Sequence, residues 1–170
     1  MEGAPVPVLG IREERFESEA MAHLQALYGT AYRMTRSRAD AEDLVQETYL
    51  RAWRSFDRFA PGTNLRAWLF TILHRARVDA LRQKGRSIAT EELQGDGPGV
   101  RPVQDSLGFG GLERALAELP ESLRAALLLR DVQGFSYQEI AGILEIPLGT
   151  VMSRLHRARA AVRQALGGER

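Results

Sequence analysis

The sequence predicts an all-α protein made of two small helical domains. Apolar residues recur at three- and four-residue steps along most of the chain, and no segment shows the alternation of a strand. Helical periodicity stops over one long stretch, from Ser87 to Gly111, where six glycines and two prolines accompany four acids and one arginine. We therefore expect a flexible N-terminal extension over 1–13, a first domain over 14–88, a flexible acidic linker over 89–111 and a second domain over 112–167.

Composition narrows the function further. Each half of the 170 residues would be small, and small domains gain from docking on a partner. The chain has no cysteine, which excludes disulfide frameworks, cysteine-ligated zinc and thiol nucleophiles. No stretch approaches the roughly 20 apolar residues that span a bilayer, and Met1–Gly10 is a poor signal peptide. We expect a cytoplasmic protein with no membrane insertion.

The first domain is expected to hold three helices. An amphipathic pattern predicts the first over Glu14–Arg36, with Leu24 among its inward residues. Ser37 is a candidate N-cap for the second, which ends near Trp53. After the turn at Pro61–Gly62, Asn64 can cap the third, which is apolar at its start and basic at its end.

The second domain is expected to hold a helix-turn-helix. A short helix over Leu112–Leu119 and another from Pro120 to Arg130 precede it. Ser136–Glu139 forms a capping box that opens a helix ending near Leu144. The turn Glu145–Pro147 leads to the last helix, Leu148–Leu166. Because Val151, Leu155 and Ala158 face inward, the opposite face presents Thr150, Ser153, Arg154, His156 and Arg157.

These side chains hydrogen-bond base edges and phosphates, and an α-helix fits the major groove of DNA. The alternative is a solvated basic helix on a bundle. The capping box, the short turn and the absence of acids from the last helix together favour DNA.

At this point the chain resembles a known family over about residues 14–166. LPESLRAALLLRDVQGFSYQEIAGILEIPLGTVMSRLHRARAAV resembles sigma region 4, which reads the −35 promoter element. DAEDLVQETYLRAWRSFDRF resembles region 2.2, and NLRAWLFTILHRARVDALRQKGR resembles regions 2.3 and 2.4. The order of these motifs, without regions 1 and 3, is typical of the compact extracytoplasmic-function (ECF) sigma factors of the sigma-70 family.

The resemblance implies a subunit that binds core RNA polymerase, through the β′ clamp helices and the β subunit, and directs promoter-specific initiation. The residues expected to bind the polymerase are Asp40, Asp43, Gln46 and Glu47. Taken alone, this surface would more readily be interpreted as a solvated acidic face. The resemblance also implies an anti-sigma factor, and a linker that threads toward the polymerase active site.

Region 2.3/2.4 implies recognition and melting of the −10 element as single-stranded DNA. The candidate residues are Phe59, Asn64, Arg66, Arg75, Arg77 and Arg82. Trp68 is assigned to the core by its helical spacing. Many family members have Asn at the position of Arg75, so the family does not say whether Arg75 contacts DNA.

Region 4 implies duplex recognition at −35, by Arg130 together with the five residues of the last helix. For Arg130 a phosphate contact and a helix C-terminal cation are equally open. Glu145 occupies a turn position where Gly is frequent in related folds, so we expect a slightly different turn.

The sequence leaves two other functions to consider. A helix-turn-helix regulator with an N-terminal sensor or dimerisation domain would leave the acidic and basic helices of the first domain unexplained. An enzyme has little support, because His23, His74 and His156 lack metal-ligand spacing and no phosphate loop or nucleophile elbow occurs. We expect no catalysis, cofactor or metal.

Overall fold

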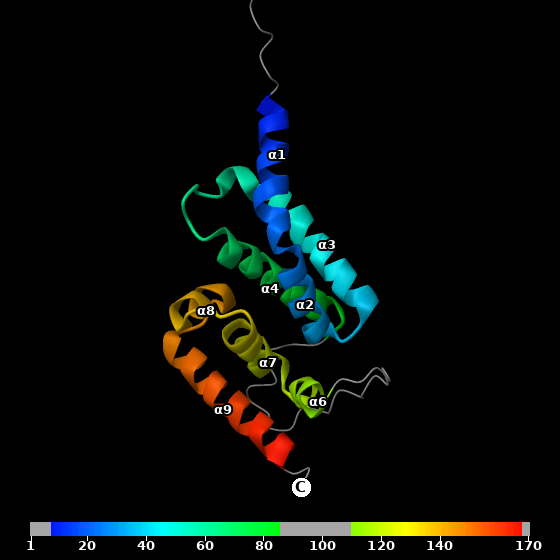
Figure 1. Cartoon of the computed structure of the whole chain (residues 1–170), viewed down its shortest axis with the longest axis vertical. Coiled ribbons are helices and arrows are strands. Elements are labelled where there is room, and N and C mark those ends of the chain that lie inside the picture. Colours follow the sequence, from blue (N-terminus) through cyan, green and yellow to red (C-terminus); the bar gives the residue numbers. More distant parts are fainter. Residues whose placement is uncertain (1–7, 86–109, 168–170) are drawn as a thin grey trace, which may run out of the picture.

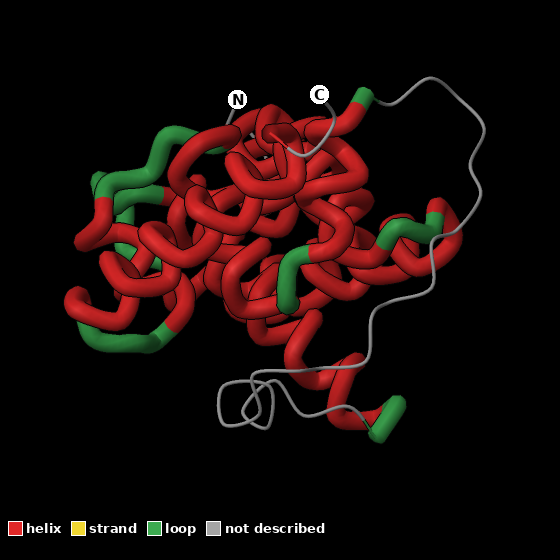
Figure 2. Tube along the Cα trace, turned by 90° about the horizontal axis from the view of Figure 1, so that it is seen from below, coloured by secondary structure: helices red, strands yellow, loops and turns green. Residues whose placement is uncertain are grey.

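The computed structural model describes residues 8–85 and 110–167. Within these ranges the chain forms helices joined by short loops and contains no strand (Figure 2). The all-α prediction is therefore confirmed. Nearly all of the predicted linker lies outside the described residues, and only Gly110 and Gly111 are seen, at the start of a helix.

Residues 8–85 form four α-helices and two short 3-10 turns. These are α1 (Val8–Ala20), η1 (Met21–His23), α2 (Leu24–Thr35), α3 (Arg38–Ser55), η2 (Phe56–Arg58) and α4 (Leu65–Gln83). Both predicted caps are present. Ser37 Oγ accepts a hydrogen bond from the Asp40 amide at 3.2 Å, and Asn64 Oδ1 accepts one from the Ala67 amide at 3.0 Å.

The prediction for the first helix is wrong in two respects. It begins at Val8, so residues 8–13 are helical rather than part of a loose extension, and η1 divides the expected single helix. The early start is anchored by Arg12, which donates to Asp57 at 2.8 Å and to the Trp53 carbonyl at 2.6 Å. The tighter 3-10 turn rotates the following residues, which leaves Leu24 exposed instead of inward.

The C-terminal half contains α6 (Gly111–Glu118), α7 (Glu121–Leu127), the π-helical turn η3 (Leu128–Val132), α8 (Tyr137–Leu144) and α9 (Leu148–Gly167). The capping box is complete: Ser136 Oγ accepts from the Glu139 amide at 3.1 Å, and Glu139 Oε1 accepts from the Ser136 amide at 3.2 Å. The helix-turn-helix therefore follows the predicted boundaries.

The turn inside the helix-turn-helix is left-handed at Glu145. Glu145 adopts φ 57° and ψ 44°, the left-handed conformation that glycine enters most easily. The expectation that a glutamate here changes the turn is therefore wrong. A non-glycine residue held in this region carries backbone strain, which the surrounding structure has to offset.

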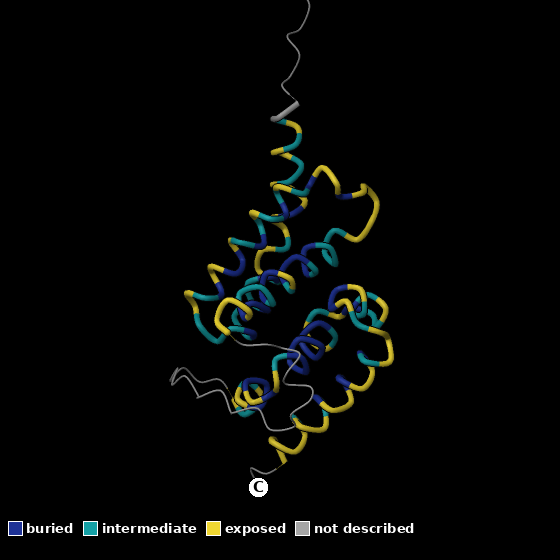
Figure 3. Tube along the Cα trace, turned by 180° about the vertical axis from the view of Figure 1, so that it is seen from behind, coloured by how far each residue is buried: buried dark blue, intermediate teal, exposed yellow. Residues whose placement is uncertain are grey.

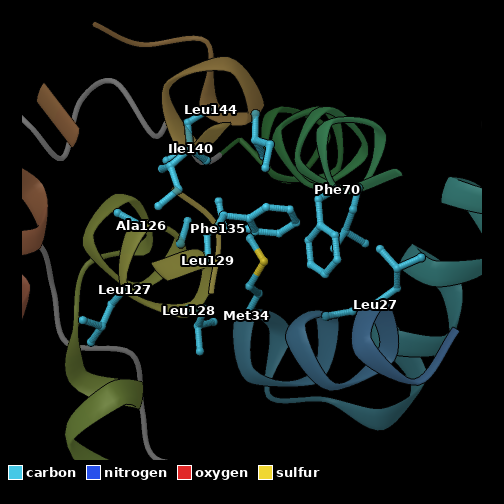
Figure 4. Close-up of a cluster of buried hydrophobic side chains, with 14 of the residues drawn as sticks. Leu27, Met34, Phe70, Ala126, Leu127, Leu128, Leu129, Phe135, Ile140 and Leu144 are labelled. Atoms are coloured by element: carbon cyan, nitrogen blue, oxygen red, sulfur yellow. The ribbon is translucent and has the colours of Figure 1, made fainter. Parts of the chain in front are cut away.

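The two halves pack against each other. In Figure 1, α2 and α4 face α7 and α8, and contacts between these helices join the halves into one apolar cluster. Buried segments concentrate in α4 and α7, whereas the outer side of α9 is exposed (Figure 3). Helix α4 is buried on two sides, because Phe70 and Ile72 point to nearly opposite sides of the helix and both are buried, Phe70 against Phe135 of the C-terminal half (Figure 4).

Candidate nucleic-acid interface

The recognition face of the helix-turn-helix lies on α9. Val151, Leu155 and Ala158 are buried, as predicted, which turns Ser153, His156 and Arg157 to solvent. These three lie on one side of the helix, at positions i, i+3 and i+4. Thr150 at the start of α9 is half-buried, and its carbonyl accepts a hydrogen bond from Ser153 Oγ at 3.1 Å.

Arg130 and Arg154 are placed differently from this exposed trio. Arg154 is buried, with 7% of its surface exposed. Arg130 donates to the Phe135 carbonyl at 2.8 Å, and its guanidinium lies 5.1 Å from the centre of the Tyr137 ring. Both contacts of Arg130 hold the loop before α8. They fit the role of a cation at a helix C-terminus at least as well as that of a phosphate-binding residue.

The residues predicted for the −10 element gather at α4 and the loop before it. Arg82 is exposed near the end of the helix, and Asn64 caps its start. Phe59 is buried in this structure: its ring stacks on Phe56 at 6.3 Å and lies 5.1 Å from Trp68. Phe59 thus supports the loop from inside, and Trp68 packs against the core as predicted.

The remaining −10 candidates contact the C-terminal half. Arg66 donates to the Gln133 carbonyl at 2.5 Å and to Gln133 Oε1 at 2.8 Å. The other three candidates each contact a glutamate. Asn64 Nδ2 donates to Glu139 at 2.9 Å, and Arg77 Nε donates to Glu121 at 2.7 Å. Arg75 donates to Glu145.

The residues predicted to bind the polymerase share α3. Asp43 and Gln46 are exposed, and Asp40 and Glu47 are half-exposed. Two of the four already have cationic partners: Glu47 accepts from Arg51 at 2.7 Å, and Asp40 lies 3.5 Å from Lys84. The face is therefore acidic but partly neutralised within the chain.

Sequence reasoning missed an exposed leucine on the same surface. Leu50 follows Asp43 by seven residues and Gln46 by four, and it is 44% exposed. Beside the residues predicted to bind the polymerase, Leu50 adds apolar area that a partner protein would bury. The signal was in the sequence, since Leu50 falls outside the inward pattern of its helix.

The residues of the C-terminal half that meet α4 were also missed. They are Glu121, Gln133, Phe135, Glu139 and Glu145. The available signal was apolar residues on both sides of α4, because Phe70 and Ile72, two residues apart, point to nearly opposite sides of the helix and cannot face one core together.

Burial shifts the pKa of His23, His74 and Tyr49. Burial lowers the pKa of His74. Burial also raises the pKa of Tyr49 to about 12, and its hydroxyl donates to the Ala20 carbonyl at 2.8 Å. Among residues 8–85 and 110–167, no group of three acidic or histidine side chains could hold a metal ion. No described helix is long and apolar enough to cross a membrane.

Comparisons with known proteins match both halves of the chain. Residues 20–87 match the model of sigma-70 region 2, and residues 110–162 match that of sigma-70 region 4. The chain is 41% identical over 152 residues to the ECF RNA polymerase sigma factor SigE of Mycolicibacterium smegmatis, covering 85% of this chain and 58% of that protein. It is 35% identical over 153 residues to the ECF RNA polymerase sigma factor EcfG of Rhodopseudomonas palustris, covering 86% and 82%.

A solved structure agrees with this match. The sigma factor RpoE of Bartonella quintana, in complex with the anti-sigma factor NepR, superposes with a TM-score of 0.74 at 34% identity, covering 92% of this chain and 99% of that one. Both regions occur in the family's order, on the all-α fold that the sequence predicted. The chain therefore belongs to the ECF group of the sigma-70 family of sigma factors.

Proposed function

We propose that this protein is a promoter-specificity subunit that binds core RNA polymerase and starts transcription at a defined set of promoters. One observation carries the proposal: a protein-binding face on α3 and a DNA-recognition face on α9 stand exposed on one chain that matches sigma regions 2 and 4. The proposed subunit catalyses nothing itself and supplies recognition to the polymerase. Because its partner is the polymerase, we place it in the cytoplasm.

The proposed polymerase contact is the surface of α3. Asp43 and Glu47 supply negative charge, Asp40 and Gln46 flank them, and Leu50 supplies apolar area. A surface of this kind suits a basic helical partner with apolar anchors, as expected for the β′ clamp helices.

The proposed −35 contact is made by Ser153, His156 and Arg157, which are exposed on one side of the first half of α9. Arginine pairing with guanine is the commonest specific contact in the major groove. A serine hydroxyl can hydrogen-bond the edges of several different bases. Thr150 lies beside them, and Arg130 and Arg154 support the helix-turn-helix from within. The exposed side chains would thus contact the bases, whereas the two arginines would hold α9 in place.

The proposed −10 contact uses α4. Arg66, Arg75, Arg77 and Arg82 provide cations for the backbone of an unpaired strand, and Asn64 lies at the mouth of the preceding loop. Phe59 shapes that loop from inside, through its contacts with Phe56 and Trp68.

An anti-sigma factor is proposed as the regulator. The support is the match to the Bartonella sigma factor, whose structure holds an anti-sigma factor, over 92% of this chain. Such a partner would act by covering the surfaces on α3, α4 and α9.

The polymerase contact is tested by reversing its charge. We expect Asp43→Lys combined with Glu47→Lys to weaken binding to core RNA polymerase at least about tenfold, a change of about 1.4 kcal/mol. Binding is measured by fluorescence anisotropy of labelled protein titrated with core enzyme. The matched control, Glu14→Lys with Glu17→Lys, makes the same charge change on the exposed side of α1. Equal affinity of both variants would show that α3 is not the docking surface.

A further inference from the structure

We propose that Met152 is a specificity-determining residue, which recognises the C5-methyl group of a thymine in the −35 element. Met152 lies on α9 and is 53% exposed, more than any other large apolar side chain in residues 110–167. The polar residues beside it are already proposed as −35 contacts, whereas Met152 offers an apolar surface instead of a hydrogen-bond donor. The inference rests on the proposed function, because α9 is proposed there as the −35 contact.

The helix itself sets the direction of the Met152 side chain. Its neighbours Val151 and Leu155 are buried, and each residue of an α-helix turns the side-chain direction by about 100°. His156 therefore points about 40° away from Met152, and Ser153 about 100° away from it. Met152 thus lies on the DNA-recognition side of α9, next to His156.

Gly149 adds no side chain to this side of α9. It precedes Met152 by three residues, so it lies on the same side of the helix, and it is exposed. A Cβ atom at this position would meet nothing within 4 Å, so packing among the described residues does not require a glycine here. Glycine permits a close approach between the backbone and a ligand. A base edge can therefore come close to the helix beside Met152.

Met152 also lines an open groove between the start of α8 and α9. Tyr137 and Leu155 line the same groove, so a small apolar group that enters it is contacted by more than one apolar side chain. The remaining lining residues supply one imidazole and two guanidinium groups: His156, Arg159 and Arg163. Helix α9 contains no acidic residue. Apolar side chains among cations suit a base edge flanked by phosphates better than an apolar segment of a protein.

Thymine is the base that fits this surface. In the major groove, thymine is the one base that presents a methyl group, whereas adenine and cytosine present amino donors. The unbranched thioether of methionine adapts to the shape of an apolar partner. Covering an amino group of adenine or cytosine with Met152 would leave that donor without a partner. Met152 therefore favours thymine at the base step that it contacts.

The test removes the methyl group alone. A promoter duplex identified by run-off transcription is titrated with the holoenzyme, and each thymine of its −35 element, on either strand, is replaced in turn by deoxyuridine. Deoxyuridine keeps the hydrogen-bonding edge of thymine and lacks only the C5-methyl group. We expect one replacement to weaken binding of the parent holoenzyme about fourfold, the effect expected for one buried methyl group. In Met152→Ala, the same replacement should leave the affinity unchanged.

Two further variants separate base recognition from a general effect on the helix. Leu166→Ala removes an exposed apolar side chain from the far end of α9 and should keep the fourfold effect of deoxyuridine. Met152→Leu keeps an apolar side chain at the recognition position and should also keep a methyl effect. All three substitutions change exposed side chains, so the fold is retained in each.

Two results would overturn the proposal. In the first, no deoxyuridine replacement weakens binding of the parent holoenzyme. In the second, Met152→Ala retains the full methyl effect. If that variant also binds core polymerase more weakly, Met152 belongs to a protein contact instead.

The two proposals fail separately. Promoter-specific transcription without a methyl effect leaves the sigma function standing and makes thymine recognition wrong. If no promoter is transcribed, the sigma function is wrong, and the same replacements are made in duplexes that the protein alone selects from random sequences. A methyl effect that requires Met152 in those duplexes supports thymine recognition, and a protein that selects no duplex overturns both proposals.

Discussion

At the scale of single residues, His74 is the most unusual group in the fold. It lies on α4 where the two halves of the chain meet, and it lines a small cavity together with Thr30, Leu73 and Leu144. Its Nδ1 is the one buried side-chain nitrogen or oxygen among the described residues without a hydrogen-bond partner. Burial, its largest influence, lowers its pKa; the nearby carboxylates Glu121 and Glu145 raise it, and the cations Arg154 and Arg75 lower it.

This predicts a pH dependence of stability. The unfolded chain binds a proton near the ordinary pKa of 6.5, whereas the folded chain binds it only at lower pH. The contribution of neutral His74 is thus fully present above pH 6.5 and is lost as the pH falls toward the lowered value. When the pH is lowered from about 7.5 to about 5.5, we expect the free energy of unfolding to fall less for His74→Leu than for the parent protein. Urea unfolding at the two pH values measures both changes.

His23 is retained in both proteins, so its own lowered pKa cancels from the comparison. At the higher pH, the leucine should also stabilise the fold by about 1 kcal/mol, since it removes a buried polar atom without a partner. An identical pH dependence in the two proteins would show that His74 does not titrate between the folded and unfolded states in this way.

A second residue-level prediction concerns recognition of the −35 element. Arg157→Ala should remove about 1–3 kcal/mol of discrimination between a promoter and the same promoter with its −35 sequence replaced. Holoenzyme binding to the two duplexes measures this difference. Arg163→Ala serves as control, because Arg163 is exposed further along the same helix. Equal losses from both variants would indicate a contact with phosphates rather than bases.

At the scale of elements, helix starts are encoded locally. Ser37, Asn64 and Ser136 each accept a hydrogen bond from the amide three residues on, as the sequence predicted. A cap depends only on residues within one turn, which is why single-sequence reasoning found all three. The start of α1 was missed because its anchor, Asp57, lies 45 residues from Arg12.

The capping box of α8 gives a prediction at this scale. Ser136→Ala should lower the free energy of unfolding by about 1 kcal/mol, because the Glu139 amide loses its partner at the helix start. Urea unfolding followed by circular dichroism measures the loss. Gln138→Ala, at an exposed position of the same helix, should change stability little. If the two substitutions cost the same, the box does not stabilise α8.

At the scale of the whole molecule, the sequence predicted the helices and the helix-turn-helix but not their packing. Periodicity assigned Trp68 to the core side of α4, yet it did not reveal that Phe70, on the other side of the helix, is buried against Phe135 of the C-terminal half. For the same reason Arg154 was expected on the DNA face although it is buried. Contacts such as Arg77–Glu121, 44 residues apart, leave no local pattern.

The candidate site follows the same division. Residue types and spacing located the exposed Ser153, His156 and Arg157, since their own helix sets their direction. The surroundings of α4 depend on two segments meeting in space, so the sequence signalled that α4 needs a second partner but not which residues of the C-terminal half supply it. The polymerase and promoter contacts stay predictions at the level of individual residues.

The central claim is that the chain confers promoter specificity on core RNA polymerase. The most direct test is run-off transcription on a pool of genomic promoter fragments, with core polymerase alone and with the protein added. We predict discrete transcripts that appear only with the protein and share sequences near −35 and −10. No protein-dependent transcript, together with tight duplex binding by the protein alone, would contradict the claim and indicate a helix-turn-helix regulator instead.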